Sequence, residues 1–282
     1  MAASIKINKF DTCVAINSVV YFLIAYYFVV FAFNLFSMII ASFLGFDVEL
    51  FYYGFTHSGK AWTTGDLILV FFVGNAFTLL TAVLFELLYR KQRKYVRSIK
   101  ILFLWIYLVS IMWFFGNLIV GAFFNFGIGT ALRAFHVPFF LRGLLAMVSI
   151  FFLMFFGYRS QKHIRVSANL YFKKLGHRDV GRYFLTQIVI PIVIGIIIIV
   201  ILKIPHVSQY NYYDLYLLFC FAFFVLGLFY NFKKITSLTF KDHSTKVSGN
   251  MRKSCNVAYL PVIIMIFFLA IIRLGLVNGL AF

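Results

Sequence analysis

The longest apolar stretch of the chain is VAINSVVYFLIAYYFVVFAFNLFSMIIASFLGF, residues Val14–Phe46, and its 33 positions hold no charged side chain. A transmembrane helix needs about 20 apolar residues, so this stretch indicates a membrane protein. At about 1.5 Å per residue its helix would extend for about 50 Å, whereas the hydrocarbon core of a bilayer is about 30 Å thick. We therefore expect this helix to tilt, to protrude or to break.

Six further apolar runs follow the first. They are Leu67–Tyr89, Ile101–Phe124, Pro138–Tyr158, Tyr183–Leu202, Leu215–Asn231 and Val257–Leu280. Because backbone amides find no water in hydrocarbon, each run should form a helix. The sequence predicts an all-α polytopic membrane protein with about seven transmembrane helices, organised as a single integral membrane domain over residues 1–282.

The composition agrees with this class. Of the 282 residues, 63% are apolar and 12% are charged, and the mean hydropathy is +0.96. Soluble domains are about 45–50% apolar and about 25% charged, so a soluble enzyme, a disordered protein and a secreted disulfide scaffold are excluded. The cysteines Cys13, Cys220 and Cys255 are odd in number and lack C-x-x-C spacing, a pattern that predicts neither a disulfide framework nor a metal site.

Basic residues gather in segments that alternate along the chain. The tail holds Lys6 and Lys9, and the loops Arg90–Lys100, Arg159–Arg182 and Lys233–Lys253 hold six, seven and six Lys or Arg. The positive-inside rule then places the N-terminus and these loops in the cytoplasm and the C-terminus outside an inner or plasma membrane. Membrane orientation accounts for the net charge of +18, so no nucleic-acid partner is expected.

Three ionisable residues, Glu86, Arg142 and Arg273, lie inside predicted spans. Glu86 precedes Arg90 by four residues, which predicts an ion pair on one helix face; the alternative is a working carboxylate. Arg142 is expected to reach the outer interface, and Arg273 to do the same or to contact another subunit.

The histidines do not form a metal site. None of the six is three or four residues from another, so no helix presents two imidazoles to one metal ion. We expect no metal and no cofactor.

Two segments on the predicted outer side hold candidate binding residues. Residues 47–53, DVELFYY, alternate charged or aromatic side chains with apolar ones, as a short strand at the interface does, and residues 125–142 are rich in glycine. Either the two segments form an outer pocket with acids on one side and cations on the other, or they are solvated loops. The candidate binding residues are Asp47, Glu49, His57, Arg133, His136 and Arg142.

On the predicted cytoplasmic side, Arg159–Arg182 interleaves basic and apolar residues. This pattern fits an interfacial helix on anionic lipid or a docking surface for an acidic partner. The basic residues that would form it are Arg159, Lys162, Arg165, Lys173, Lys174 and Arg178. The expected partners are therefore membrane lipids, anionic at this face, and other membrane protein subunits.

Residues Phe33–Phe55, FNLFSMIIASFLGFDVELFYYGF, resemble the signature segment of site-2 proteases, the intramembrane zinc metalloproteases. In that family a helical HExxH motif is followed by small and apolar residues, then by Gly-Phe and an alternating strand. The resemblance implies that Phe33 and Ser37 stand at the zinc-ligand positions and Asn34 at the general-base position.

The same resemblance extends to Gly74-Asn75, which is similar to part of the glycine-rich second helix of the family. The family also has a later aspartate as third ligand, whereas this chain has no acidic residue between Glu86 and Asp179. Phenylalanine and serine cannot hold zinc as two imidazoles do. The resemblance therefore implies a degenerate relative that lacks zinc and protease activity.

The favoured function is a non-enzymatic multi-pass membrane subunit that anchors or scaffolds a larger membrane complex. The alternative is a permease or lipid-handling transporter, and a third, less favoured hypothesis is an intramembrane enzyme at the outer face. A transporter would use the polar residues Asn34, Asn75, Asn117, Gln187 and Arg142. An enzyme would use Glu49, His57, Asp66 or His136.

Overall fold

A computed structural model describes residues 9–52, 54–58, 61–203, 215–230, 238–240, 255–276 and 279–281. Within these ranges five helical segments are long and apolar enough to cross a membrane, and two shorter apolar helices accompany them. The five are α1 (Lys9–Phe43), α2 (Thr64–Gln92), α3 (Ile99–Phe123), α5 (Phe139–Ser167) and a segment made of α6 (His177–Phe184), a π-helical turn (Leu185–Val189) and α7 (Ile190–Lys203). The shorter ones are Leu215–Phe229, which includes α9 (Phe221–Phe229), and α10 (Tyr259–Gly275). The chain is an all-α protein with the helices of an integral membrane protein.

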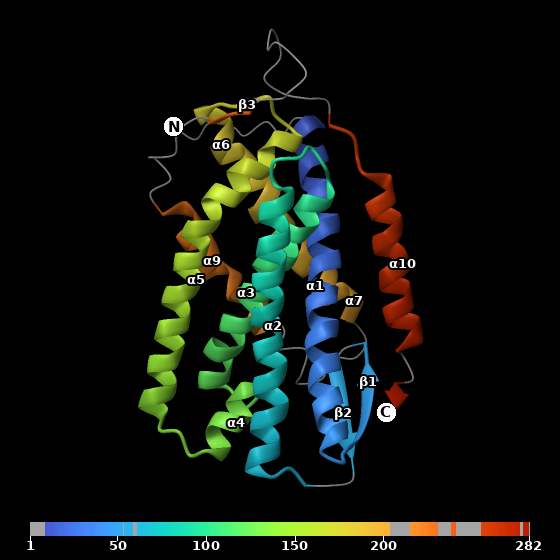
Figure 1. The fold of residues 1–282 in the computed structure, drawn as a ribbon, viewed down its shortest axis with the longest axis vertical. Helices are drawn as coiled ribbons and strands as arrows, with labels where there is room; N and C mark the ends of the chain where they lie inside the picture. The colour runs from blue at the N-terminus through green and yellow to red at the C-terminus, as the bar shows by residue number, and fades with distance from the viewer. Residues whose placement is uncertain are drawn as a thin grey trace.

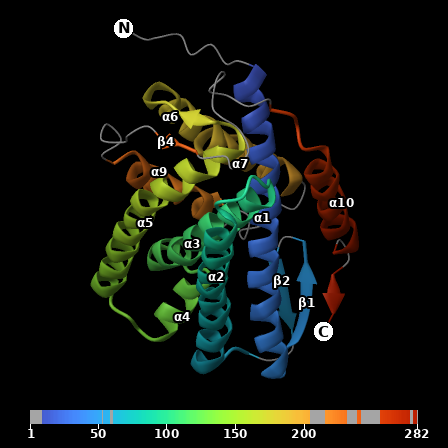
Figure 2. The same cartoon turned by 45° about the horizontal axis from the view of Figure 1, so that its top comes forward.

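The long helices lie side by side along the long axis of the molecule (Figure 1). α3 packs against α1, α2 and α5, and α10 stands at the edge next to α1 (Figures 1 and 2). We call the end where α1 begins the basic end, because Arg90–Lys100 and the described part of Arg159–Arg182 lie there. The opposite end holds β1 (Asp47–Phe51), β2 (Gly54–Ser58) and α4 (Ile128–Ala134).

Two small antiparallel sheets lie at the two ends. At the opposite end β5 (Leu280–Ala281) completes a sheet of order β2-β1-β5. At the basic end β3 (Lys174–Leu175) pairs with β4 (Leu238–Thr239). The predicted span Val257–Leu280 is therefore shorter in the structure, because its helix ends at Gly275 and a strand follows.

α1 is one unbroken helix of 35 residues, so the possibility of a break is wrong. The helix ends where Gly45 takes a φ of +82°, in the left-handed region that glycine tolerates best. The amide of Phe46 donates to the backbone oxygen of Ala41 at 3.2 Å, which is a common way to close a helix C-terminus. A helix of this length extends for about 52 Å, so it protrudes or tilts in any bilayer.

Aromatic side chains fill the space between α1 and α3. Trp105 and Trp113 of α3 are fully buried. The Trp105 ring lies 5.1 Å from that of Phe22, and the Trp113 ring lies 5.8 Å from that of Tyr26, both edge to face. Such pairs add to the free energy of burial, so α3 forms the centre of the core.

The basic segment after Tyr158 is not the single interfacial helix that its composition predicted. α5 continues to Ser167, and a 3-10 turn, β3 and α6 follow. Most of the large apolar residues of this segment point into the protein. Buried among them are Ile164, Tyr171, Phe172 and Leu175. The pattern was misleading because a helix end and a turn packed on the core also interleave apolar and basic residues.

Two glycines let α5 and α9 approach closely. A Cβ atom added at Gly157 of α5 would collide with the backbone oxygen of Phe224 and lie 3.0 Å from the nitrogen of Leu228. A Cβ atom added at Gly227 of α9 would collide with the backbone of Met154. Small residues at a crossing allow such backbone contact between membrane helices.

The side chain of Gln161 fixes the end of α9 to α5. Its amide nitrogen donates to the backbone oxygens of Leu228 and Tyr230, both at 2.8 Å. The last carbonyl groups of a helix have no partner within the helix. Gln161 therefore satisfies two groups that would otherwise be exposed to an apolar environment.

Candidate functional site

The acidic outer candidates lie on strand β1. Asp47 and Glu49 are exposed, whereas Val48 and Leu50 between and after them are buried. The predicted alternating strand at this position is therefore confirmed. His57 stands opposite Val48 in the register of β2, and its side chain lies outside the described part of the structure.

The basic outer candidates lie in and after α4. Arg133 donates from Nη2 to the backbone oxygen of Phe123 at 3.0 Å, so it satisfies a carbonyl at the end of α3. His136 has a φ of +55°, an uncommon conformation for a residue other than glycine. The guanidinium carbon of Arg142 lies 5.7 Å from the ring centre of Phe139, within the range of a cation–π contact.

The structure does not bring these two groups together. Among the described residues, no hydrogen bond or ion pair joins Asp47 or Glu49 to Arg133, His136 or Arg142. The β1–β2 hairpin and α4 lie on opposite sides of α1 and α2 in both views (Figures 1 and 2). An outer ligand would therefore meet either the acidic hairpin or the basic segment.

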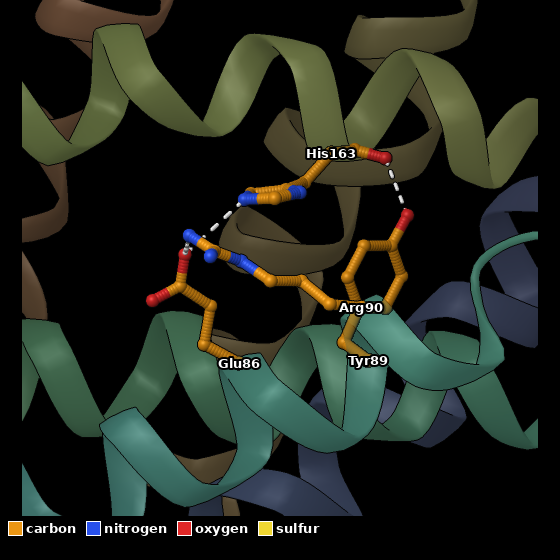
Figure 3. Close-up of polar contacts among 4 residues, drawn as sticks. All are labelled: Glu86, Tyr89, Arg90 and His163. Carbon is orange, nitrogen blue, oxygen red and sulfur yellow. Dashed lines mark hydrogen bonds and ion pairs between the residues drawn. The ribbon is translucent and has the colours of Figure 1, made fainter.

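Glu86 lies near the basic end of α2, and its predicted ion pair with Arg90 is confirmed. Arg90 Nη2 lies 2.5 Å from Glu86 Oε1. The same oxygen lies 3.4 Å from Nε2 of His163 on α5, which is 6% exposed. Tyr89 comes three residues after Glu86 on α2, and its hydroxyl donates to the backbone oxygen of His163 at 2.6 Å (Figure 3).

These contacts join α2 to α5 and hold the carboxylate between a guanidinium and an imidazole. His163 was not singled out from the sequence, because no short motif connects it to Glu86 across 77 positions. The only signal was that Glu86 lies near the end of one predicted span and His163 just after the end of another, both on the predicted cytoplasmic side. The Glu86–Arg90 pair lies within α2 and contributes about 0.3–0.5 kcal/mol. The contacts of Glu86 and Tyr89 to His163 are the ones that fix which faces of α2 and α5 meet.

A second polar cluster lies between α2 and α3. Asn117 Nδ2 donates to Asn75 Oδ1 at 3.1 Å, and Asn75 Nδ2 donates to the backbone oxygen of Phe114 at 3.3 Å. Both asparagines are at most 2% exposed. Each amide thus finds a partner on the neighbouring helix, as polar residues between membrane helices commonly do.

The positions that the site-2-protease resemblance selects fall on two faces of α1. Ser37 and Phe33 face Gly74 of α2, where an added Cβ atom would collide with Ser37 Oγ and lie 3.2 Å from the Phe33 ring. Asn34 faces the other way and lines a small pocket with Tyr52. The three side chains therefore do not converge on one point.

The proline of the fifth predicted span has a clear structural consequence. Pro191 has no N–H group, and the chain just before it forms a π-helical turn. The backbone oxygen of Gln187 accepts a hydrogen bond from Ser18 Oγ at 2.6 Å, and Ser18 Oγ accepts one from Trp105 Nε1 at 2.8 Å. The carbonyl of Gln187, four residues before the proline, thus connects the π-helical turn before α7 to α1 and α3.

Cys13 and Cys255 form a disulfide with a Cα–Cα distance of 6.2 Å. The sequence analysis predicted no disulfide framework, and in this respect it was wrong. The two residues are 242 positions apart, so spacing carried no signal. Asn17 adds two hydrogen bonds at the same place: it donates to the backbone oxygen of Asn256 at 3.1 Å and accepts from the amide of Ala258 at 2.8 Å.

At the basic end a lysine is completely buried. Lys100 Nζ donates to the backbone oxygen of Tyr95 at 2.9 Å and to Oδ1 of Asn169. Asn169 in turn donates to the backbone oxygen of Arg93 at 3.2 Å. Burying a charge is tolerated only with such partners, and these bonds tie the α2–α3 turn to the end of α5. Sequence reasoning had counted Lys100 among the loop charges.

The residues of the predicted cytoplasmic surface differ in exposure. Arg159, Lys162 and Lys174 are exposed, and Arg165 and Lys173 are half-buried. The side chain of Arg178 lies outside the described part of the structure. Three of the five members whose side chains are described are therefore accessible at the surface.

Arg273 does not extend away from the bundle. Its Nη1 donates to the backbone oxygen of Leu202 at 2.6 Å, and its guanidinium carbon lies 5.9 Å from the ring centre of Tyr52. Arg273 therefore ties α10 to the end of α7 within this chain.

No three His, Cys, Asp or Glu residues gather into a possible metal site in the described ranges. No known protein family, curated protein or solved structure matches the chain.

Proposed function

We propose that the protein is a non-enzymatic multi-pass integral membrane subunit that anchors or scaffolds a larger membrane complex. The observation that supports this most directly is that several of its interior polar groups bind other parts of the same bundle. The Asn75–Asn117 pair joins α2 to α3, the Ser18–Gln187 bond joins α1 to α7, and Gln161 joins α5 to α9. Such groups stabilise an architecture and leave few of their atoms for chemistry.

The outer faces of α2, α5 and α10 support the same proposal. Large apolar side chains cover them, and in a bilayer such faces meet either lipid or another membrane protein. Among the most exposed are Phe72 of α2, Phe151 of α5, and Tyr259, Phe267 and Leu274 of α10. A scaffold needs free faces of this kind, since its partners have to pack on them.

The transporter alternative has less support. The polar residues that a transport path would use lie in separate places: Asn34 near β1, Asn75 and Asn117 between α2 and α3, and Gln187 where α7 crosses α1. A path for a polar substrate needs such groups to line one continuous cavity.

The test uses photoreactive residues placed singly at exposed positions of the full chain in its native membrane. We expect a residue at Phe72, Phe151 or Phe267 to crosslink to another membrane protein, which then co-purifies in mild detergent. A photoreactive residue at the buried Phe22 is the matched control and should crosslink only within the chain. If all three exposed positions crosslink lipid alone and the purified chain is monomeric, the scaffold proposal is wrong.

We also propose seven membrane crossings, with the basic end in the cytoplasm and the C-terminus outside. The alternating Lys and Arg counts support this orientation, and so does the position of β5 at the end opposite to the start of α1 (Figure 1). α10 has 17 residues and extends for about 26 Å, close to the thickness of a hydrocarbon core.

Reporter fusions test the proposed orientation. A reporter that is active only outside the cytoplasm should be active when fused after residue 282 and inactive when fused after Gln92, in the α2–α3 turn. Equal activity at both positions would mean that the chain crosses the membrane an even number of times after Gln92, and the proposed topology, with five crossings there, would be wrong.

A further inference from the structure

A groove of about 340 Å³ lies between α1, α7 and α10. Its walls are almost entirely apolar, and their polar residues gather at the basic end. The lining residues are Asp11, Thr12, Ala15, Ile16, Val19, Val20 and Leu23 of α1, Thr186, Ile190, Ile194 and Ile198 of the α7 segment, and Met265 of α10. The volume falls at the lower end of the range of about 300–1,000 Å³ that is typical of ligand sites.

The strongest attachments of α10 to the bundle are at its two ends, and in between it contributes only partly buried apolar side chains. At the basic end the Cys13–Cys255 disulfide and the hydrogen bonds of Asn17 hold the chain just before α10. At the other end Arg273 binds Leu202, and β5 pairs with β1. Between these attachments Met265 is the one α10 residue in the groove lining, and Ile272 is the one buried residue of the helix.

The depth of the groove matches one leaflet of a bilayer. Its lining on α1 runs from Asp11 to Leu23, and on the α7 segment from Thr186 to Ile198, so that the two end residues are twelve positions apart in each case. Twelve helical residues rise about 18 Å, and half of a hydrocarbon core is about 15 Å. Because the helices that form the walls are apolar enough to lie in a membrane, the natural occupant of this space is an acyl chain.

The charges at the mouth of the groove suit a phosphate group. Arg182 lies one helical turn before Thr186, toward the basic end, and 36% of its side chain is exposed. Its Nε lies 3.8 Å from Asp11 Oδ2, a contact that orients the guanidinium. Lys9, also exposed, is the first residue of α1. A guanidinium presents five donors and binds phosphate oxygens in pairs, so Arg182 can bind Asp11 and a phosphate together.

We propose that this groove binds one glycerophospholipid, with an acyl chain between α1 and α7 and the phosphate at Arg182. The lipid fills a space that the protein leaves between α10 and the bundle. Its head lies at the basic end, where the charged residues are, and its chain follows the apolar wall toward the middle of the membrane. The site goes beyond the proposed scaffold function and does not depend on it.

The test is native mass spectrometry of the full chain in mild detergent, with dioleoylphosphatidylglycerol or dioleoylglycerol as the probe. The two probes have the same acyl chains, and only the first carries a phosphate. Ile194→Trp fills the groove from α7. Ile197→Trp is the matched control, because Ile197 is three residues further along the same helix, 54% exposed and not part of the lining. Arg182→Gln removes the charge at the mouth.

We expect the wild type and Ile197→Trp to retain one phospholipid and Ile194→Trp to retain none. Arg182→Gln should retain about tenfold less phospholipid, the effect of losing a charge-assisted hydrogen bond, while its weaker retention of dioleoylglycerol should not change. Equal retention by Ile194→Trp and Ile197→Trp, whether high or low, would show that the lipid is not in the groove. Unchanged phospholipid retention by Arg182→Gln would overturn the placement of the phosphate. Both tryptophan variants should elute as monodisperse species, and a melting curve for each checks that it is folded.

Discussion

Replacing Gly157 by valine is expected to destabilise the protein by about 3 kcal/mol, the upper end of the usual range for overpacking. A Cβ atom at this position collides with the backbone oxygen of Phe224 on α9. Backbone cannot rotate away as a side chain can, so α9 has to move from α5. The hydrogen bonds from Gln161 to the end of α9 would then lengthen or break.

The measurement is the melting temperature of the purified protein in mild detergent. Gly143→Val is the matched control: Gly143 lies in the same helix, and a Cβ atom there meets no atom within 4 Å. Both variants change helix propensity equally, so the difference between them reports the collision. If the two variants have the same melting temperature, the close crossing of α5 and α9 is not present in the protein.

Loss of the Cys13–Cys255 disulfide is expected to destabilise the oxidised protein by about 2–4 kcal/mol, the typical contribution of a disulfide. The bond closes a loop of 242 residues, which restricts the unfolded chain strongly in the chain-entropy description. It also holds the start of α10, a helix with few other contacts to the bundle. Cys13→Ser, Cys255→Ser and the double variant should therefore lose the same stability, since either change removes the whole bond.

Cys220→Ser is the control for this series, because Cys220 is a free buried cysteine. Melting curves are compared after mild oxidation, because the cytoplasm keeps thiols reduced and the proposed orientation places the pair on that side. Addition of a reductant should lower the melting temperature of the wild type to that of the variants and leave the variants unchanged. A double variant that loses twice as much as either single variant would mean that the cysteines act separately.

Much of the fold followed from the apolar pattern, because hydrocarbon forces every spanning segment to satisfy its own backbone. The predicted run Ile101–Phe124 and the observed helix Ile99–Phe123 differ by two residues at one end and by one at the other. The prediction was poorer where the chain leaves the predicted spans. The continuation of α5 to Ser167 and the strands β3, β4 and β5 depend on packing between distant segments, which a hydropathy pattern does not contain.

The candidate site was less predictable than the fold for the same reason. The Glu86–Arg90 pair is local, four residues apart on one helix, and the spacing alone predicted it. The contact from Glu86 to His163, the Asn75–Asn117 pair and the bond from Ser18 to Gln187 each join different helices. Their existence depends on the rotation of one helix against another, and the apolar faces of these helices are too uniform to define it.

The partners that α3 binds through hydrogen bonds come earlier in the chain, and this order matters during synthesis. A membrane protein is synthesised from its N-terminus, and a polar side chain that enters lipid alone is unfavourable. When α3 leaves the ribosome, the partner of Asn117 on α2 and the partner of Trp105 on α1 have already been inserted. Ser18 still awaits the carbonyl of Gln187, which arrives later. The first three helices can therefore insert with the Asn75–Asn117 and Ser18–Trp105 contacts already made, and the rest of the chain assembles onto them.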